Sequence, residues 1–275
     1  MDRSRRSEGH AYRAGSFQRL TRELACETAV AISYNGSSHA VLMATPSDLE
    51  DLALGFTLSE GIARQNQIER IEVVETPLGA DVQVWLTEEA ADTLAKRRRA
   101  LAGPVGCGMC GLESIEAAMR HVPDVASTLR LRPGQIVEAV ARMERGQELN
   151  RLTRAVHAAG FYDPATGSVI VREDAGRHNA MDKLIGSRAR TTGGVPAEIF
   201  AGGAVVMSSR LSIELVQKAA IAGCGILIAV SAPTSLAVSA AENAGMTLVA
   251  LARGAEFDIY TRPDRIIDGV MPDVA

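Results

Sequence analysis

Short apolar runs separated by turn signals organise the first third of the chain. Residues 1–24 are polar and rich in arginine, without periodicity, and predict a flexible tail. Apolar runs at 29–32 and 40–43 flank Asn35-Gly36, a dipeptide typical of tight hairpin turns. A helix is expected from Asp48, where apolar residues recur at helical spacing. Strands at 71–74 and 82–86, and a further helix from Thr87, complete a predicted small α+β part over residues 25–105.

Strand-like and helix-like segments alternate in the second half. Helices are expected at 112–121 and 133–146, and two strands, 155–162 and 168–172, flank the turn 163–167. Further along, strands at 199–207, 225–230 and 246–251 alternate with helices at 177–188, 211–222 and 235–244. This alternation predicts an α/β layer whose sheet is at least partly parallel. The fold class is therefore α/β, or α+β overall, with a larger domain over residues 106–275.

Composition and charge narrow the class of protein. Of the 275 residues, 47% are hydrophobic and 23% charged, which is ordinary for a globular protein. Ten aromatic residues and a net charge of −4 disfavour a nucleic-acid binder. Four cysteines in a chain of this length do not suggest a secreted disulfide framework, no secretory signal is visible, and the longest apolar run is too short for a bilayer. We expect a cytoplasmic protein that binds neither nucleic acid nor membrane.

The motif with the most chemical content is Cys107-Gly108-Met109-Cys110, bracketed by Gly106 and Gly111. Two thiols at this spacing can ligate a metal, cycle a disulfide or relay sulfur, or they can be two small core residues in a turn. A structural zinc site needs four ligands, and Cys26 and Cys224 do not form a second such pair. No thioredoxin-like strand precedes the motif. The glycine-rich loop best suits a thiol that must reach both a donor and an acceptor.

A polar cluster at residues 172–183 lies between a predicted strand and a predicted helix, where α/β proteins place ligands. Asp174 is expected to cap the helix. His178 and Asp182 fall one turn apart on one helix face, as do Asn179 and Lys183. The alternative interpretation is a capped helix with solvated charge pairs.

Two further segments could contact an anion. Residues 251–256 directly follow a predicted strand, and there a glycine beside an arginine can offer backbone donors and a cation to phosphate or to guanine edges. An ordinary strand-end loop explains the same residues. The basic run Lys96-Arg97-Arg98-Arg99 fits either a solvated helix end, favoured by the helix dipole, or contact with an anionic partner.

Several motifs occur in an order that resembles the FdhD/NarQ family of formate dehydrogenase accessory proteins, over residues 25–265. They are Tyr34-Asn35-Gly36, Met43-Ala44-Thr45-Pro46, Leu54-Gly55-Phe56, Ser59-Glu60-Gly61, the cysteine loop 106–111, residues 173–180, Ser231-Ala232-Pro233-Thr234 and Ile259-Tyr260-Thr261. The chain departs from the family pattern at Ala255-Glu256, where a basic pair is common, and at Ser209, where glycine is expected.

The resemblance implies a sulfur carrier. Such a protein accepts persulfide sulfur from a cysteine desulfurase and passes it to the Mo-bis-molybdopterin guanine dinucleotide cofactor, which is its cargo, for use by formate dehydrogenase. The family's persulfide position falls on Cys107, with Cys110 in an assisting role. The resemblance also implies a cytidine deaminase-like larger domain, a homodimer and no permanently bound metal.

The family's cofactor-binding segment falls on a run of six residues, which are Leu251, Ala252, Arg253, Gly254, Ala255 and Glu256. We add the hypothesis that Asp174 and His178 shape the cofactor site without transferring sulfur themselves.

Two other functions remain as alternatives. A zinc-dependent deaminase-like hydrolase needs a His-x-Glu element and a Pro-Cys-x-x-Cys element. None of the five histidines is followed two positions on by glutamate, and Pro104 is not adjacent to Cys107. A chaperone that binds the cofactor without sulfur chemistry would not need Cys107.

Overall fold

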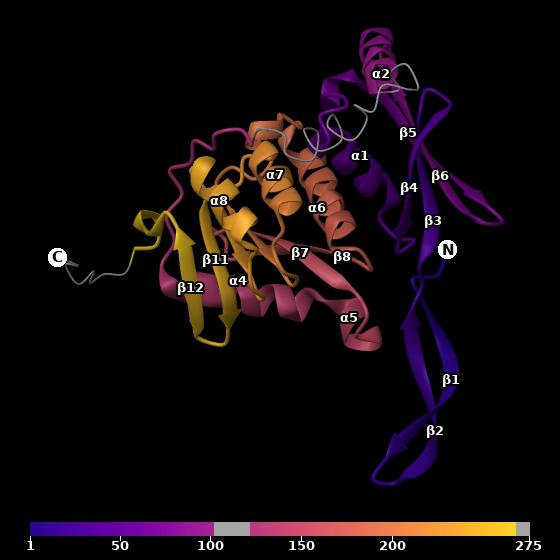
Figure 1. Ribbon diagram of the computed structural model, residues 1–275, viewed down its shortest axis with the longest axis vertical. Helices are drawn as coiled ribbons and strands as arrows, with labels where there is room; N and C mark the ends of the chain where they lie inside the picture. Colours follow the sequence, from indigo (N-terminus) through magenta and orange to yellow (C-terminus); the bar gives the residue numbers. More distant parts are fainter. Residues whose placement is uncertain (102–121, 268–275) are drawn as a thin grey trace, which may run out of the picture.

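A mixed six-stranded sheet forms the centre of the larger half of the protein (Figure 1). The computed structural model describes residues 1–101 and 122–267. The strand order is β12-β11-β10-β9-β7-β8, and β9, β10 and β11 run parallel. The strands are β7 (His157–Tyr162), β8 (Val169–Asp174), β9 (Ala204–Met207), β10 (Ile226–Ala229), β11 (Thr247–Arg253) and β12 (Glu256–Thr261). The predicted mixed α/β class with a partly parallel sheet is confirmed.

Helices cover both faces of this sheet (Figure 1). Residues alternate along each strand, so that Val205 packs toward one helix layer and Val206 toward the other. The first layer consists of α6 (Arg177–Thr192), α7 (Ile213–Ile221) and α8 (Ser235–Asn243). The second is α4 (Pro133–Gly146), which starts on a proline as predicted and is followed by α5 (Glu148–Thr153). Single 3-10 turns lie at Gln65–Gln67, Pro196–Glu198 and Pro263–Arg265.

A four-stranded sheet of order β4-β3-β6-β5 forms the smaller half. Its strands are β3 (Thr28–Tyr34), β4 (Ser37–Ala44), β5 (Ile68–Thr76) and β6 (Gly79–Leu86), and its helices are α1 (Leu49–Ser59) and α2 (Glu88–Leu101). The predicted hairpin is confirmed: Asn35 and Gly36 join β3 to β4 with φ of 47° and 77°. This is the left-handed geometry that Asn-Gly turns adopt readily.

Helix α1 joins the two halves and lies between the two sheets in Figure 1. Leu52 belongs to the core of the four-stranded sheet, whereas Leu58 belongs to the core under α6 and α7. Two glycines allow the backbones of α1 and α6 to approach closely. A Cβ on Gly55 would overlap the backbone carbonyl of Asp182, and a Cβ on Gly186 would overlap that of Asp51. The two halves therefore pack directly on each other.

The prediction that residues 1–24 form a flexible tail is wrong for most of this segment. Residues 4–25 form a two-stranded antiparallel ribbon, β1 (Ser4–Arg13) and β2 (Ser16–Ala25), that projects away from both sheets (Figure 1). The sequence hides it because neither face of the ribbon has the alternating apolar residues by which strands are recognised. Backbone pairing between its strands satisfies the main-chain groups without a hydrophobic core.

Some element boundaries also differ from the prediction. The strand expected at 199–207 is limited to β9, because Gly202 with φ of 76° turns the chain just before it. The helix expected from residue 211 begins at Ile213, since Leu211 forms a β-bridge with Pro233 instead. The helix expected at 112–121 and the boundary at residue 105 lie outside the described residues. The division into domains and the likeness to cytidine deaminases therefore stay predictions. Within the described ranges, no helix is long and apolar enough to cross a membrane.

Candidate functional site

Five strand ends meet at one edge of the six-stranded sheet. The parallel strands β9, β10 and β11 all end there, at Met207, Ala229 and Arg253. Strand β7 runs antiparallel to β9, so its first residue, His157, lies at the same edge. His157 pairs with Asp174, the last residue of β8. Two segments that the sequence singled out separately, 172–183 and 251–256, are therefore brought to one edge, which we call the site edge.

The site edge is long enough for a large ligand. Arg253 on β11 and Asp174 on β8 are four strand spacings apart in the sheet, or about 19 Å. The carboxyl ends of parallel strands are where open α/β sheets usually bind ligands. A molecule with two well-separated polar ends would fit an edge of this length.

Backbone hydrogen bonds hold the loops of the site edge together. Thr234 N donates to Leu211 O at 3.0 Å, and Leu251 N donates to Ser231 O at 3.3 Å. Ser208, which follows β9, accepts a hydrogen bond on Oγ from Ala158 N at 2.8 Å. These bonds link the loops after β9 and β10 to each other, to β11 and to β7, so the edge is preorganised.

Three arginines give the site edge a positive charge. Arg177 starts α6, Arg210 follows β9, and Arg253 ends β11. None of the three forms an ion pair with another described residue; Arg253 Nε donates only to Val230 O, at 3.3 Å. Unpaired guanidinium groups beside strand ends are suited to phosphate oxygens.

The expected cofactor segment 251–256 is a hairpin turn rather than a loop after a strand. β11 continues through Arg253, Gly254 turns the chain with φ of 58°, and β12 begins at Glu256. The sequence predicted that this strand ends at Leu251. The positive φ of 52° at Leu251 instead marks an irregularity within β11. Ala252 is buried, and the other five residues are exposed.

Asp174 lies beneath the site edge and is completely buried. Its Oδ1 accepts from Gly176 N at 2.8 Å and from Asn179 Nδ2 at 3.0 Å. Its Oδ2 lies 2.7 Å from Lys183 Nζ and accepts from Thr45 N at 3.0 Å. The prediction that Asp174 caps α6 is wrong, because the N-cap residue is Gly176 and the carboxylate is occupied by Lys183 and Thr45. Asn179 and Lys183 do share one helix face, as expected, and both bind this carboxylate.

His178 lies in the first turn of α6, one turn from Asp182, as predicted. Its Nε2 is buried and has no hydrogen-bond partner among the residues that the structure describes. Burial lowers the pKa of His178, and the charges of Arg177 and Lys218 lower it further, while Glu214 and Glu60 act in the opposite direction. These effects favour the neutral form of the imidazole.

Asp182 belongs to a buried charge cluster between α1, α6 and α7. Lys218 Nζ lies 2.9 and 3.0 Å from the two carboxylate oxygens of Asp182 and 2.7 Å from Glu60 Oε1. Ser59 Oγ also binds Asp182, at 2.7 Å. Burial opposes the charge of Lys218, but Asp182 and Glu60 outweigh it and raise the pKa of the lysine. The cluster is thus an ion-paired joint between α1, α6 and α7.

His157 and Arg210 were not assigned to the site from the sequence, whereas Arg177 lies inside the predicted polar cluster 172–183. Burial and the nearby charge of Arg177 lower the pKa of His157. The available signal was the position of each residue at the start or end of a predicted element. The sheet register, which places β7 antiparallel to β9, was needed to bring them together.

The cysteine loop, with Cys107 and Cys110, lies outside the described residues. Of the other cysteines, Cys224 is buried, and burial raises its pKa to about 12, so its thiol is unreactive at neutral pH. Cys26 is partly exposed between β2 and β3. In the described part of the chain, no group of three or more His, Cys, Asp or Glu residues is placed to hold a metal ion.

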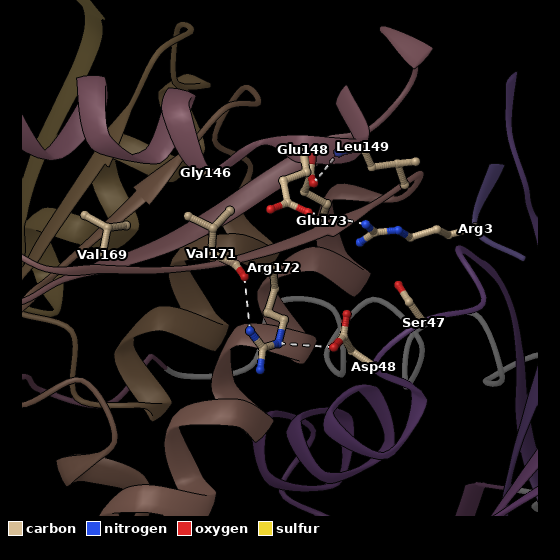
Figure 2. Close-up of a pocket in the computed structure, with 10 residues that line it drawn as sticks. All are labelled: Arg3, Ser47, Asp48, Gly146, Glu148, Leu149, Val169, Val171, Arg172 and Glu173. Carbon is tan, nitrogen blue, oxygen red and sulfur yellow. Dashed lines mark hydrogen bonds and ion pairs between the residues drawn. The ribbon is translucent and has the colours of Figure 1, made fainter. Parts of the chain in front are cut away.

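A separate pocket of about 360 Å³ lies where β8, α5, the start of α1 and the base of the ribbon meet (Figure 2). Each of its charged residues has a partner, either an opposite charge or backbone N–H groups. Glu173 accepts from Leu149 N and Asn150 N at the start of α5, and Arg3 contacts Glu148. Arg172 lies 3.7 Å from Asp48. The pocket therefore lies between the base of the ribbon and the body, and its charged side chains have partners within the protein.

Comparisons with known proteins identify the family of this chain. The sequence model of the FdhD/NarQ family matches residues 25–267. The chain is 54% identical to the sulfur carrier protein FdhD of Agrobacterium fabrum over 265 residues, which cover 96% of each chain. It is 48% identical to the protein of the same name from Brucella abortus, over 94% of this chain and 95% of that one.

A solved structure also matches. It is a crystal structure from Desulfotalea psychrophila, of a protein described as a formate dehydrogenase accessory protein. The TM-score is 0.74 at 26% identity, with 97% of this chain and 100% of that chain covered. The family match, the two relatives and the shared fold together show that this chain belongs to the FdhD/NarQ family.

Proposed function

We propose that this protein is a sulfur carrier that serves formate dehydrogenase. It takes persulfide sulfur from a cysteine desulfurase onto Cys107 and delivers that sulfur to the Mo-bis-molybdopterin guanine dinucleotide cofactor. The protein acts in the cytoplasm as a homodimer. The observation that carries the proposal is the sequence identity of 54% and 48% to two proteins that are named sulfur carriers. These identities extend over nearly the full length of the chain.

The loading step is a thiol–persulfide exchange. The Cys107 thiolate attacks the terminal sulfur of the desulfurase persulfide, a new S–S bond forms at Cys107, and the S–S bond of the donor breaks. The donor cysteine leaves as a thiolate, so that charge and electrons balance. Because the thiolate is the nucleophile, access to Cys107 matters more than tight packing around it.

The site edge supports the delivery step. A cofactor with two guanine dinucleotide arms carries several phosphates at widely separated positions. The edge offers the guanidinium groups of Arg177, Arg210 and Arg253, which have no ion-pair partner among the described residues, beside strands β8 to β11 that span about 19 Å. In this proposal, Leu251, Ala252, Gly254 and Ala255 contribute backbone groups, Asp174 fixes the start of α6 from below, and His178 faces the ligand.

Cells provide the first test. A strain that lacks its own copy of this protein is complemented with the wild type, with Cys107→Ala or with Cys110→Ala, and formate dehydrogenase activity is assayed. We expect Cys107→Ala to abolish the activity and Cys110→Ala to reduce it less. Full activity with Cys107→Ala, at equal protein level, would contradict sulfur transfer through Cys107 and would favour a chaperone that only binds the cofactor.

A further inference from the structure

The N-terminal ribbon, β1 with β2, stands away from the body of the protein (Figure 1). Ten residue pairs join its strands, from Ser4 opposite Ala25 to Arg13 opposite Ser16. Among the described residues, two ion pairs hold it to the body, both at its base: Arg3 with Glu148, and the N-terminal ammonium group with Glu75. An isolated two-stranded hairpin is marginally stable in water. A ribbon of this length therefore requires a surface to lie on.

One face of the ribbon carries basic and apolar residues and no acidic residue. The register places Arg5, Ser7, Gly9, Ala11 and Arg13 of β1 on the same face as Ser16, Gln18, Leu20, Arg22 and Leu24 of β2. We call this the basic face. Arg5, Arg13 and Arg22 have no ion-pair partner in the part of the chain that the structure describes, and Leu24 is 49% exposed. The opposite face mixes charges, with Glu8 and Glu23 beside Arg6 and Arg19, and near its tip it carries the exposed aromatic pair Tyr12 and Phe17.

The four-stranded sheet has an uncovered face of complementary character. Its inner face packs on α1, but on its outer face Val41, Met43 and Val74 are 64, 53 and 37% exposed. The small residues Ala29 and Ala31 lie between them on β3. Glu72, Asp81 and Arg70 share this face, as the β5–β6 register shows, and Arg70 lies 3.6 Å from Glu72, so that the Asp81 carboxylate is the acidic group on this face that is not in an ion pair with a described residue. We call this surface the outer sheet face.

The ribbon and the rest of the chain carry net charges of opposite sign. Residues 1–26 contain six arginines and three acidic residues, a net charge of +3. Because the whole chain has a net charge of −4, residues 27–275 carry −7. The ribbon is thus attracted to the body of another copy of the same chain. It cannot lie across its own sheet, because only Cys26 and Glu27 join β2 to β3 and Cys26 N is bonded to Arg3 O at 3.0 Å.

We propose that the basic face of the ribbon of one copy lies on the outer sheet face of a second copy, and that the second copy reciprocates. This inference rests on the homodimer of the proposed function and assigns the surfaces that form it. A ten-residue ribbon is about 33 Å long and about 10 Å wide, so that one ribbon on one sheet buries about 600 to 700 Å² in total. Two reciprocal contacts bury about 1,200 to 1,400 Å², which reaches the range of stable interfaces, whereas a single contact does not.

Analytical ultracentrifugation of the full-length chain tests the proposal with matched pairs of variants. On the ribbon, Arg5→Glu with Arg22→Glu alters the basic face, and Arg6→Glu with Arg19→Glu makes the same charge change on the opposite face. On the sheet, Val41→Lys with Met43→Lys alters the outer sheet face, and Leu78→Lys, at the 90% exposed tip of the β5–β6 turn, is the control.

We expect the wild type to be a dimer. In the basic-face and outer-sheet variants, the Kd of dimerisation should be about 100-fold higher or more, since each change acts at two contacts. The two control variants should remain dimeric. Combining the basic-face and outer-sheet variants should restore part of the affinity, because glutamates would then face lysines, and this rescue shows that the variants fold.

A monomeric wild type, a basic-face variant that stays dimeric, or controls that dissociate equally would each overturn the proposal. Cys107→Ala should dimerise like the wild type. A failure of sulfur transfer and a failure of this interface are therefore read out separately.

Discussion

Asp174 and Lys183 form an ion pair of 2.7 Å in which both side chains are completely buried. Thr45, from the connection between β4 and α1, binds both members: its N donates to Asp174 Oδ2 at 3.0 Å, and its O accepts from Lys183 Nζ at 2.9 Å. The pair thus joins the N-terminal half of the chain to the strand end that carries the site edge.

Removal of the lysine from this pair is expected to destabilise the protein strongly. Lys183→Met leaves the Asp174 carboxylate buried without its counter-charge, which costs about 3 to 5 kcal/mol. Urea denaturation followed by circular dichroism measures the free energy of unfolding. Arg142→Met, which breaks the exposed pair with Glu138, is the control and should cost less than about 1 kcal/mol. Equal losses in the two variants would contradict the structural role of the buried pair.

Protonation of His178 should make the folded state less stable in mild acid. Burial, Arg177 and Lys218 lower its pKa in the folded state, so the unfolded chain takes up the proton first, near pH 6.5, as pH falls. The contribution is constant above that pH and is lost progressively between about pH 6.5 and the lower folded pKa. We expect His178→Gln to lose less free energy of unfolding than the wild type between about pH 7.5 and pH 5.5. His10→Gln, on the exposed ribbon, is the control, and a parallel decline of His178→Gln and wild type would refute the prediction.

Glu256 is expected to limit the affinity of the site edge for nucleotides. It is the cross-strand partner of Arg253, so its carboxylate offsets the charge of that arginine. With GDP as a probe, we expect Glu256→Gln to tighten binding by about two- to fivefold at low salt and Arg253→Ala to weaken it by a similar factor. Isothermal titration calorimetry at two salt concentrations provides the measurement. Asp258→Asn, two residues along β12, should change the affinity little, and an equal gain in that variant would point to a general charge effect.

Local signals in the sequence were sufficient to predict the elements that begin or end at residues typical of turns or helix starts. Asn35-Gly36 predicted the β3–β4 hairpin, and Pro133 predicted the start of α4. The strand–helix alternation of the second half predicted the parallel strands. The ribbon was missed because its strands carry alternating polar residues on both faces, and only cross-strand backbone pairing defines it.

The site could be predicted only in pieces. The segments around Asp174 and Arg253 were visible as polar residues at strand ends, but their common edge depends on strand order, which no local pattern contains. The burial of Asp174 was not predictable either, because its partner Thr45 is 129 positions away along the chain. His157 lies at the site edge because it pairs with Asp174, and no sequence motif indicated this position.

The central claim is that Cys107 carries the sulfur, and intact-mass spectrometry tests it most directly. The protein is incubated with a cysteine desulfurase and cysteine, and its mass is compared before and after reduction. The account predicts a mass gain of about one sulfur atom, which reduction removes and which is absent in Cys107→Ala. The gain should persist in Cys224→Ala, because the Cys224 thiol of the wild type is buried and unreactive. A gain that persists in Cys107→Ala, or no gain in the wild type, would contradict it.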